Sequence, residues 1–351
     1  MSELNKISAD GGSFPRRPHA LSVDDYVAGV QAGNRTILAR AITLVESSSR
    51  IHEAQAQEVL QRLILRPAKA RRIGITGVPG VGKSTFLEKF GCFLTAKGHK
   101  VAVLTIDPSS SRSGGSILGD KTRMECLSRD ENAFIRPTPA GSNLGGVARR
   151  TRETMILCEA AGFDTILIES VGVGQSEITL RSMVDFFLLL LIPGAGDELQ
   201  GIKKGIIEMA DWVMINKADG DNRLRAEQAR IEQDAALHYM QPATPTWKSE
   251  AALCSALTGE GISELWECID RFYRELEPKG IIARRRQEQA LDWLTDLIHN
   301  ELQRSFYSNP RVTARMPALQ GALLRGEITA VRAAQTLLAL HEGHNEQSPS
   351  T

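Results

Sequence analysis

Residues 77–84 read GVPGVGKS, which matches the pattern G-x-x-x-x-G-K-[ST]. The apolar run 72–76 precedes this motif, and the run TFLEKF at 85–90 follows it. A strand, a glycine loop and a helix start in this order are the context of a phosphate-binding P-loop. The alternative is a glycine turn that only opens a helix. We expect the phosphates of a nucleotide to be bound by Gly77, Val78, Pro79, Gly80, Val81, Gly82, Lys83, Ser84 and Thr85.

Lys83 and Ser84 carry the two side chains that P-loop chemistry requires. Lys83 would reach the β and γ phosphates, which makes it a candidate catalytic residue, and the Ser84 hydroxyl would lie on Mg²⁺. The sequence therefore predicts a nucleoside triphosphate bound together with Mg²⁺.

Three carboxylates are candidates for completing the magnesium site. Asp107 follows the apolar run 101–106, Asp120 follows a glycine-rich stretch, and Glu169 ends the run 165–169. Mg²⁺ is usually held through one or two carboxylates together with phosphates and waters. We expect Asp107 and Asp120 to lie close to the metal and Glu169 to hold a water. For each acid, a helix-capping or solvated role is the alternative.

Gly172 follows Glu169 closely and is a candidate for sensing the γ-phosphate through its backbone N–H, a contact that would be lost on hydrolysis. The next residue is Val173, whereas many GTPases place there a glutamine that orients the attacking water. We therefore expect slow intrinsic hydrolysis that a partner accelerates.

Residues 216–219 read NKAD and close the apolar run that begins at Trp212. The Asp219 carboxylate can accept two hydrogen bonds from guanine, whereas adenine offers no such pair of donors. Lys217 would lie over the base and Asn216 would brace the loops. A solvated loop is the alternative for the tetrapeptide alone, and an ordinary strand end is the alternative for the later serine-alanine loop. We expect GTP and GDP as ligands, with the guanine oxygen reached by a backbone N–H of the loop Ser255, Ala256 and Leu257.

The composition is that of an ordinary globular protein, with 42% hydrophobic and 24% charged residues. Lys plus Arg and Asp plus Glu both number 42, so no global field favours nucleic acid or an anionic membrane. The apolar runs are too short to span a bilayer, and the N-terminus has no signal-like segment, so we expect a cytoplasmic protein. We expect reduced thiols, because no C-x-x-C spacing links the five cysteines Cys92, Cys126, Cys158, Cys254 and Cys268.

Alternating strand-like and helix-like stretches predict an α/β fold, with a mostly parallel, doubly wound sheet flanked by helical extensions. The expected domains are a disordered N-terminus (1–20), a helical N-terminal extension (21–70), a P-loop G domain (71–279), a helical dimerisation region (280–341) and a disordered tail (342–351). Ser22 and Asn34 are predicted helix caps. The predicted strands cover residues 73–76, 101–106, 133–136, 165–169, 187–192, 212–216 and 252–255.

The C-terminal region carries an unpartnered apolar row at Leu291, Leu294, Ile298 and Leu302, spaced as one face of a long helix. The region is too small to hold a core alone, so we expect it to dock on the G domain and to dimerise.

Taken together, these segments resemble the MeaB/ArgK family of methylmalonyl-CoA mutase-associated GTPases. The resemblance covers most of residues 70–260 and extends to 37–47. Long strings carry it more specifically than the P-loop does. They include GVPGVGKSTFLEKFG (77–91), GGSILGDKTRM (114–124), IESVGVGQSE (168–177) and PGAGDELQGIKKGIIEMAD (193–211). Ser170 departs from the family pattern, in which threonine is usual.

The resemblance implies a homodimeric P-loop GTPase of the signal-recognition and metallochaperone class. Such a protein assists adenosylcobalamin loading into a cobalamin-dependent acyl-CoA mutase, methylmalonyl-CoA mutase first among them, and protects that mutase. A cob(I)alamin adenosyltransferase is a further candidate partner. Lys83, Asp107, Asp120 and Glu169 match phosphate and magnesium positions. Residues 194–204 match a mobile element that relays nucleotide state, although a solvated loop would carry the same charges. Its predicted switch residues are Asp197, Glu198, Gln200 and Lys203.

Three other functions compete with this interpretation. A nickel-type metallochaperone GTPase needs Cys or His ligands near the switch loops, and the sequence shows no such cluster. A transport-linked kinase or ATPase needs adenine recognition, against which NKAD argues. A structural dimer with a vestigial site is disfavoured because Lys83, Ser84 and the acids are all present.

Overall fold

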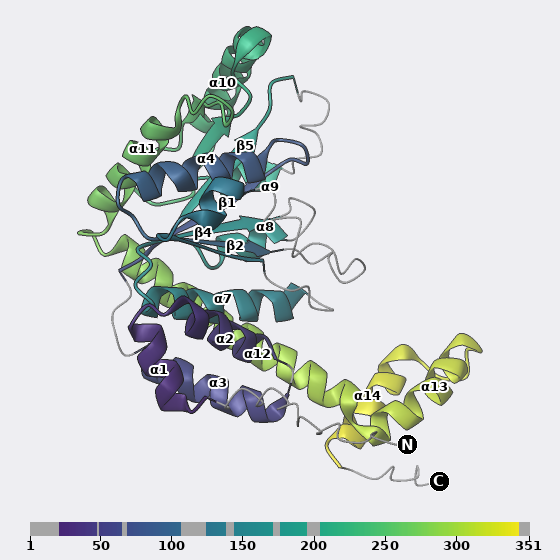
Figure 1. Cartoon of the computed structure of the whole chain (residues 1–351). Helices are drawn as coiled ribbons and strands as arrows, with labels where there is room; N and C mark the ends of the chain where they lie inside the picture. Colours follow the sequence, from purple (N-terminus) through teal and green to yellow (C-terminus); the bar gives the residue numbers. More distant parts are fainter. Residues whose placement is uncertain are drawn as a thin grey trace, which may run out of the picture.

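The computed structural model describes residues 21–47, 49–64, 69–106, 124–137, 144–170, 176–194 and 204–343. Within these residues a seven-stranded sheet forms the centre of the molecule, in the order β3-β2-β4-β1-β5-β6-β7 (Figure 1). Every neighbouring pair is parallel. The strands are β1 (Arg71–Gly77), β2 (Val101–Ile106), β3 (Ala133–Pro137), β4 (Thr165–Ser170), β5 (Phe186–Leu191), β6 (Trp212–Ile215) and β7 (Ala251–Leu253).

Helices cover both faces of this sheet, which is why the central residues of its strands are apolar and buried. Helix α4 contacts β1 and β2 from one side, whereas α7 contacts β2 from the other (Figure 1). The helices are α1 (Val23–Gln31), α2 (Arg35–Glu46), α3 (Arg50–Leu63), α4 (Lys83–Ala96), α6 (Glu125–Arg129), α7 (Leu144–Ala160), α8 (Ser176–Arg181), α9 (Lys204–Glu208), α10 (Arg223–His238), α11 (Ile262–Leu276), α12 (Ile281–Ser308), α13 (Pro310–Leu324) and α14 (Ala330–His341). The predicted α/β fold is confirmed.

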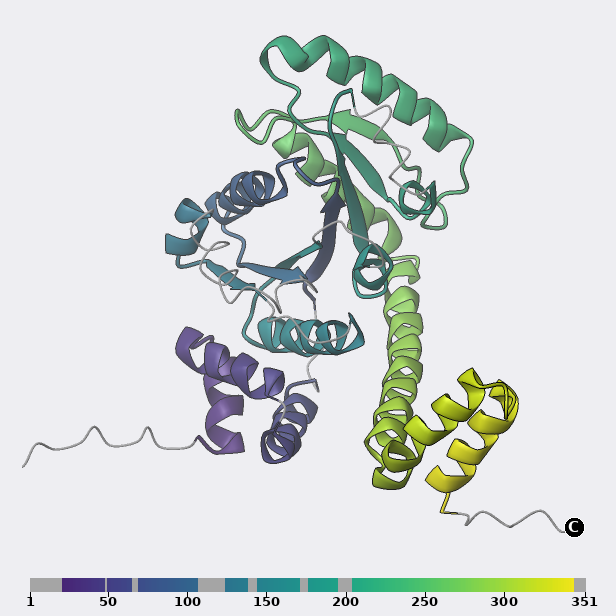
Figure 2. The same ribbon diagram turned by 90° about the vertical axis from the view of Figure 1, so that its right-hand side faces the viewer.

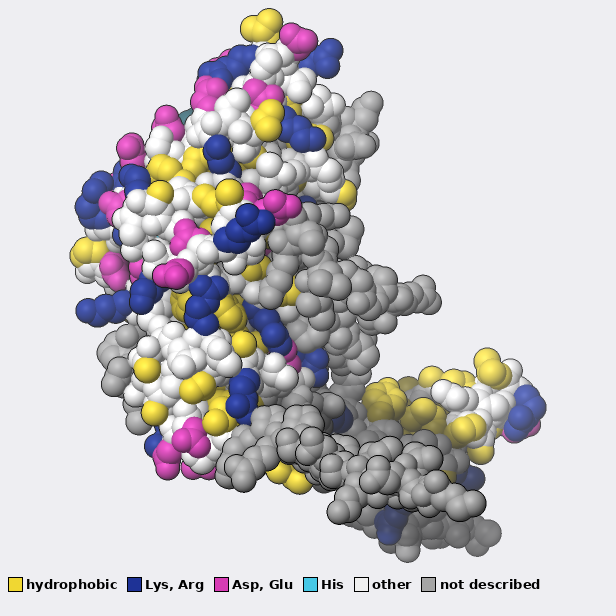
Figure 3. Space-filling view, viewed as in Figure 1, with side chains coloured by type: hydrophobic (Ala, Val, Ile, Leu, Met, Phe, Trp, Pro, Cys, Tyr) yellow, Lys and Arg dark blue, Asp and Glu magenta, His cyan; other side chains and the backbone are white. Residues whose placement is uncertain are grey.

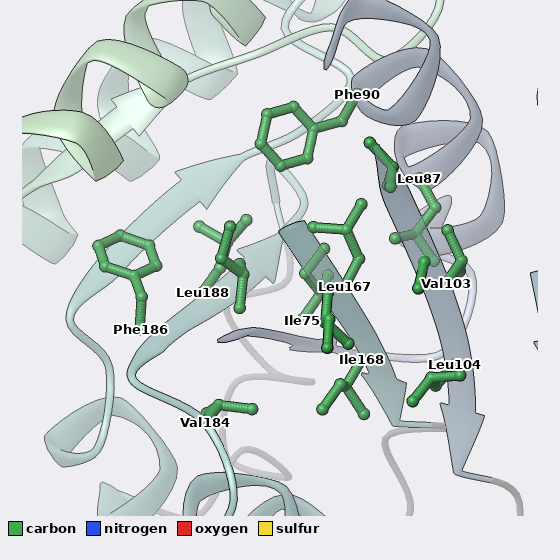
Figure 4. Packing of buried hydrophobic residues seen from close by; sticks show 14 of the residues in the cluster. Ile75, Leu87, Phe90, Val103, Leu104, Leu167, Ile168, Val184, Phe186 and Leu188 are labelled. Atoms are coloured by element: carbon green, nitrogen blue, oxygen red, sulfur yellow. The ribbon is translucent and has the colours of Figure 1, made fainter. Parts of the chain in front are cut away.

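The core lies between the central strands and the helices on either side. All residues of β2 and of β5 are buried. Leu87 and Phe90 of α4 lie over the central strands (Figure 4). On the sheet, Val103 of β2 is in register with Leu167 of β4. The first helix after β1 is thereby fixed against the sheet, so the loop that joins them is held at both ends.

The N-terminal helices α1, α2 and α3 pack on one another and on α7 (Figure 2). Ser22 caps α1 through a reciprocal capping box with Asp25, and the Asn34 side chain caps α2. Both caps are as the sequence predicts.

The C-terminal helices begin beside the central sheet and then extend away from it (Figure 2). Near its start, α12 is tied to the sheet by the ion pair between Arg286 and buried Asp185, 2.6 Å. Helix α13 packs on α12 and on α14. Helices α13 and α14 stand away from the sheet, and we call them the arm (Figure 2). Contact with the sheet and its helices therefore belongs to α12, which lies against Gly145 of α7 as far along as Asn300, and not to the arm.

Strand boundaries differ from the predictions mainly at the last strand. Strand β7 covers Ala251–Leu253, whereas the sequence predicts 252–255. The chain turns after Leu253, because the Gly259 N–H donates to the Ser255 carbonyl and the Ser255 N–H donates to the Glu260 carbonyl. Asn216 likewise lies just after β6 instead of inside it. Ser255 and Asn216 are thus loop residues.

No helix in the described part of the chain is long and apolar enough to cross a membrane. The predicted disorder of residues 1–20 and of most of the tail falls outside the described residues.

Candidate functional site

The P-loop joins the carboxyl end of β1 to the first residue of α4. Gly77 packs so closely on β5 that an added Cβ would lie 2.4 Å from the Leu190 carbonyl oxygen. Gly82 has a φ of +89°, in the left-handed region that favours glycine, and it caps α4 without a side-chain hydrogen bond. The N–H groups of the first turn of α4 are therefore left for an anion, as a phosphate site requires.

Lys83 folds back over the loop that it follows. Its Nζ donates to the carbonyl oxygens of Gly77, at 2.8 Å, and Val78, at 3.3 Å. Burial lowers the pKa of Lys83, and the charges of Glu169 and Glu177 oppose that shift without cancelling it. The ammonium group is thus held within the loop, close to two carboxylates.

The end of β4 lies beside the end of β1 and brings Glu169 to the same edge of the sheet. Ile75 of β1 is in register with Glu169. One position further, the hydroxyls of Thr76 and Ser170 are hydrogen bonded at 2.7 Å, and both side chains are buried. This hydrogen bond therefore joins the two strand ends by their side chains.

The residues at this edge fit a magnesium ion in their chemistry. Ser84 lies in the first turn of α4 and Glu169 near the end of β4, and both are partly buried oxygen donors, the ligand type that Mg²⁺ prefers. These two residues are the described part of the predicted magnesium site.

The residues predicted to bind the base meet on the other side of the P-loop. The Asn216 side chain donates to the Val81 carbonyl oxygen, at 2.8 Å, and accepts from the Ala256 N–H, at 3.0 Å. The Asp219 carboxylate accepts a hydrogen bond from the Ser255 hydroxyl. Three loops that are distant in sequence are therefore joined by side chains that the sequence singles out.

Three details of this region bear on how a base would bind. Lys217 is exposed and has a φ of 60°, a left-handed conformation that is uncommon for a residue with a side chain. The Ala256 N–H is engaged by Asn216, so a guanine oxygen would share or replace that contact. Leu257, the last residue of the predicted serine-alanine loop, is 75% exposed.

Several predicted residues lie outside the described part of the chain. They are the metal candidates Asp107 and Asp120, the phosphate sensor Gly172, and the switch residues Asp197, Glu198, Gln200 and Lys203.

The structure adds Glu177 to the site, a residue to which the sequence alone assigns no role. Glu177 is 3% exposed on α8, and its charge acts on Lys83. Its Oε2 atom is buried without a hydrogen-bond partner in the described residues. No sequence motif places Glu177 at a fixed distance from the P-loop. The packing of α8 against β1 and β4 brings this residue to the site.

Comparison with protein families decides which P-loop protein this is. The family model described as methylmalonyl-CoA mutase-associated GTPase MeaB matches residues 38–311. The chain belongs to the MeaB family. It is accordingly a GTPase that binds guanine nucleotides.

Named relatives agree with this assignment. GTPase ArgK of Escherichia coli is 47% identical over 285 residues, covering 81% of this chain and 86% of ArgK. The mitochondrial methylmalonic aciduria type A homolog of Mus musculus is 46% identical over 326 residues, covering 90% of this chain and 79% of the relative. The crystal structure of an LAO/AO transport system kinase superposes with a TM-score of 0.73 at 36% identity, covering 91% of this chain and 97% of that one. This MeaB-family GTPase therefore shares both sequence and fold with proteins named for different roles.

Proposed function

We propose that this GTPase is a chaperone of a cobalamin-dependent acyl-CoA mutase, with methylmalonyl-CoA mutase as the first candidate. In this proposal it assists loading of adenosylcobalamin and protects the loaded mutase, with a cob(I)alamin adenosyltransferase as a further partner. The observation that carries the proposal is the match of a mutase-associated GTPase family to residues 38–311, which include the whole described nucleotide site. The mouse relative, named for methylmalonic aciduria, supports the same mutase.

The described site supports distinct roles for its two ends. At the phosphate end, the uncapped first turn of α4 and Lys83 would hold the β and γ phosphates, and Mg²⁺ would bind to Ser84 with Glu169 holding a water. Hydrolysis breaks the bond between the γ-phosphorus and the bridging oxygen as water attacks in line. Lys83 would stabilise the charge that develops on the phosphate oxygens.

At the base end, Asp219 would select guanine. Its carboxylate accepts from Ser255, which leaves lone pairs on both oxygens for the guanine N1–H and exocyclic amine. Asn216 would keep that loop at a fixed distance from the P-loop. An adenine nucleotide lacks these two donors and would leave the carboxylate unpaired. The lost hydrogen bonds would lower the affinity for adenine nucleotides strongly.

The nucleotide state would reach the mutase through the segment between β5 and α9. This connection leaves the carboxyl edge of the sheet, beside the P-loop, and contains the switch residues Asp197, Glu198, Gln200 and Lys203. We propose that contacts to the γ-phosphate change this segment, together with Gly172, when GTP is hydrolysed.

Self-association would use the C-terminal helices. The apolar row on α12 is exposed, with Leu291 at 65%, Leu294 at 54%, Ile298 at 50% and Leu302 at 59%. Hydrophobic side chains also gather on the arm of α13 and α14 (Figure 3). Apolar patches of this kind mark protein interfaces, and a second copy would bury them. Replacing Leu294 and Ile298 together by Asp should give a monomer in sedimentation, whereas Leu224→Asp on exposed α10 should not. A wild-type monomer at micromolar concentration would contradict the dimer.

Capture of the mutase in two nucleotide states tests the chaperone proposal. Immobilised full-length chain is incubated with methylmalonyl-CoA mutase in the presence of Mg²⁺ with GDP or with a non-hydrolysable GTP analogue. We expect capture that differs between the two states, and Lys83→Ala should abolish the difference because it cannot hold the γ-phosphate. Transfer of adenosylcobalamin to apo-mutase is then followed by absorbance. Equal and negligible capture in both states, with unchanged transfer, would overturn the proposal while leaving the GTPase assignment intact.

A further inference from the structure

Two cysteines that are far apart in the chain meet a glutamate between α4 and α6. One ligand atom from each of Glu88, Cys92 and Cys126 lies within 4.8 Å of the other two. Glu88 and Cys92 are four residues apart on α4 and so share one face of that helix. The helices approach closely here, since a Cβ added at Gly91 would lie 2.5 Å from Leu127. Three possible metal ligands therefore converge from two packed helices.

The glutamate in this cluster is held in place by one oxygen and has the other unsatisfied. The Cys126 backbone N–H donates to Glu88 Oε1 at 2.7 Å. Glu88 Oε2 is buried and has no hydrogen-bond partner among the described residues. A buried carboxylate oxygen without a partner is unfavourable, and a cation bound there would satisfy it.

The charge around the thiols also favours a cation. Burial raises the pKa of Cys92 to about 11, and the nearby carboxylates Glu88 and Asp130 add to that shift. A divalent cation at the same point would reverse the effect of these groups, because it stabilises thiolates. Cys126 is exposed, so an ion could enter from solvent.

We propose that Glu88, Cys92 and Cys126 bind a thiophilic divalent cation of the zinc type. Two thiolates and a carboxylate are a ligand set for zinc, whereas Mg²⁺ and Ca²⁺ take oxygen ligands. Metal–ligand distances of about 2.0–2.3 Å place tetrahedral ligands roughly 3.3–3.8 Å apart, so small side-chain rotations suffice to close the site. The ion replaces the two thiol protons, which pass to solvent, and the fourth position takes water or an outside donor.

This site is separate from the magnesium position at Ser84 and bears on the same helix. Helix α4 begins at Lys83 in the P-loop, and Glu88 and Cys92 lie further along it. Helix α6 is the first described element after residue 123. A bound ion would join the two helices and stabilise the folded state by an amount that rises with the logarithm of the free ion concentration above the dissociation constant.

Cobalt spectroscopy tests the site directly. The full-length chain is reduced, stripped with a chelator, saturated with GDP and Mg²⁺, and titrated with Co²⁺ and then with Zn²⁺ against a zinc indicator. We expect one ion per chain and a thiolate-to-cobalt charge-transfer band in the near ultraviolet. Cys126→Ser, at an exposed position, should remove that band and weaken zinc binding by at least about tenfold. Cys92→Ser should do the same, and Glu88→Gln should weaken zinc while keeping the thiolate band.

The controls separate ligation from folding and from oxidation. Cys268→Ala, on α11 and outside the cluster, should bind like the wild type, and GDP affinity should be unchanged in Cys126→Ser. Absence of the thiolate band in the reduced wild type, or an equal band in Cys126→Ser, would overturn the proposal. A second result would also overturn the proposal: two free thiols disappear together when reductant is removed, and the re-reduced protein binds no ion. Cys92 and Cys126 would then be a redox pair and not metal ligands.

Discussion

Asn216 Nδ2 donates a hydrogen bond of 2.8 Å to the carbonyl oxygen of Val81, so the residue after β6 is tied directly to the P-loop. The same side chain accepts from the N–H of Ala256 after β7, at 3.0 Å. Asn216 is 1% exposed, which makes both bonds internal to the protein. The phosphate end and the base end of the site are therefore positioned by one side chain.

Asn216→Ala should weaken guanine nucleotide binding because it separates these loops. The substitution leaves the Val81 carbonyl and the Ala256 N–H without this partner, at a cost of about 1–3 kcal/mol for each buried group. We expect GDP affinity to fall by about 10- to 100-fold in calorimetry, at about 1.4 kcal/mol per tenfold. Asn222→Ala is the matched control, since Asn222 is exposed and makes no capping bond. Equal GDP affinities for wild type and Asn216→Ala would show that the bridge does not position the site.

The pH dependence of nucleotide binding should report on Lys83. In the nucleotide-free protein, burial lowers the pKa of this lysine below 10.5, the usual value for a lysine side chain. A bound phosphate favours the ammonium form and raises that pKa, so binding takes up a proton at pH values between the two pKa values. GDP affinity should therefore fall as the pH rises through the lowered pKa, with a slope of up to about tenfold per pH unit.

Lys83→Arg is the comparison for that experiment. Arginine stays charged throughout this range, so the alkaline loss of affinity should disappear even if the overall affinity is lower. The measurement is the GDP dissociation constant from neutral to alkaline pH. A parallel loss of affinity in both proteins would assign the titration to another group.

The sequence predicts those features of the fold and the site that depend on residues close together in the chain. The run 101–106 is predicted as a strand with the bounds of β2, because its residues VAVLTI are all apolar or β-branched and the structure buries all six. The P-loop and NKAD are found because their chemistry fixes the spacing of their residues. By contrast, the charge of Glu177 acts on Lys83 only because tertiary packing brings α8 near the P-loop, and Cys92 and Cys126 meet only through the packing of α4 and α6. The predicted strand end at Ser255 lies two residues beyond the end of β7, because the hydrogen bonds of Ser255 form within a turn, which the hydrophobic pattern does not encode.

Asp185→Asn should destabilise the whole fold, because this buried carboxylate connects α12, α11 and the sheet. Asp185 is 0% exposed, pairs with Arg286, and accepts from the Tyr273 hydroxyl at 2.8 Å. Removing the charge leaves the Arg286 guanidinium partly buried without its ion pair, a loss of about 3–5 kcal/mol in the free energy of unfolding. Denaturant unfolding measures the change. Glu288→Gln, which breaks an exposed pair with Arg284, should cost at most about 1 kcal/mol, and similar midpoints for the two variants would refute the role of Asp185.

The most direct test of the account is calorimetric titration of the nucleotide-free chain with GDP and with ADP, in the presence of Mg²⁺. The account predicts tight binding of GDP, little or no heat with ADP, and loss of that preference in Asp219→Asn. Asp221→Asn, exposed on the same loop, should keep it. Equal affinity for the two nucleotides, or an unchanged guanine preference in Asp219→Asn, would contradict the assignment of Asp219 as the residue that selects the base.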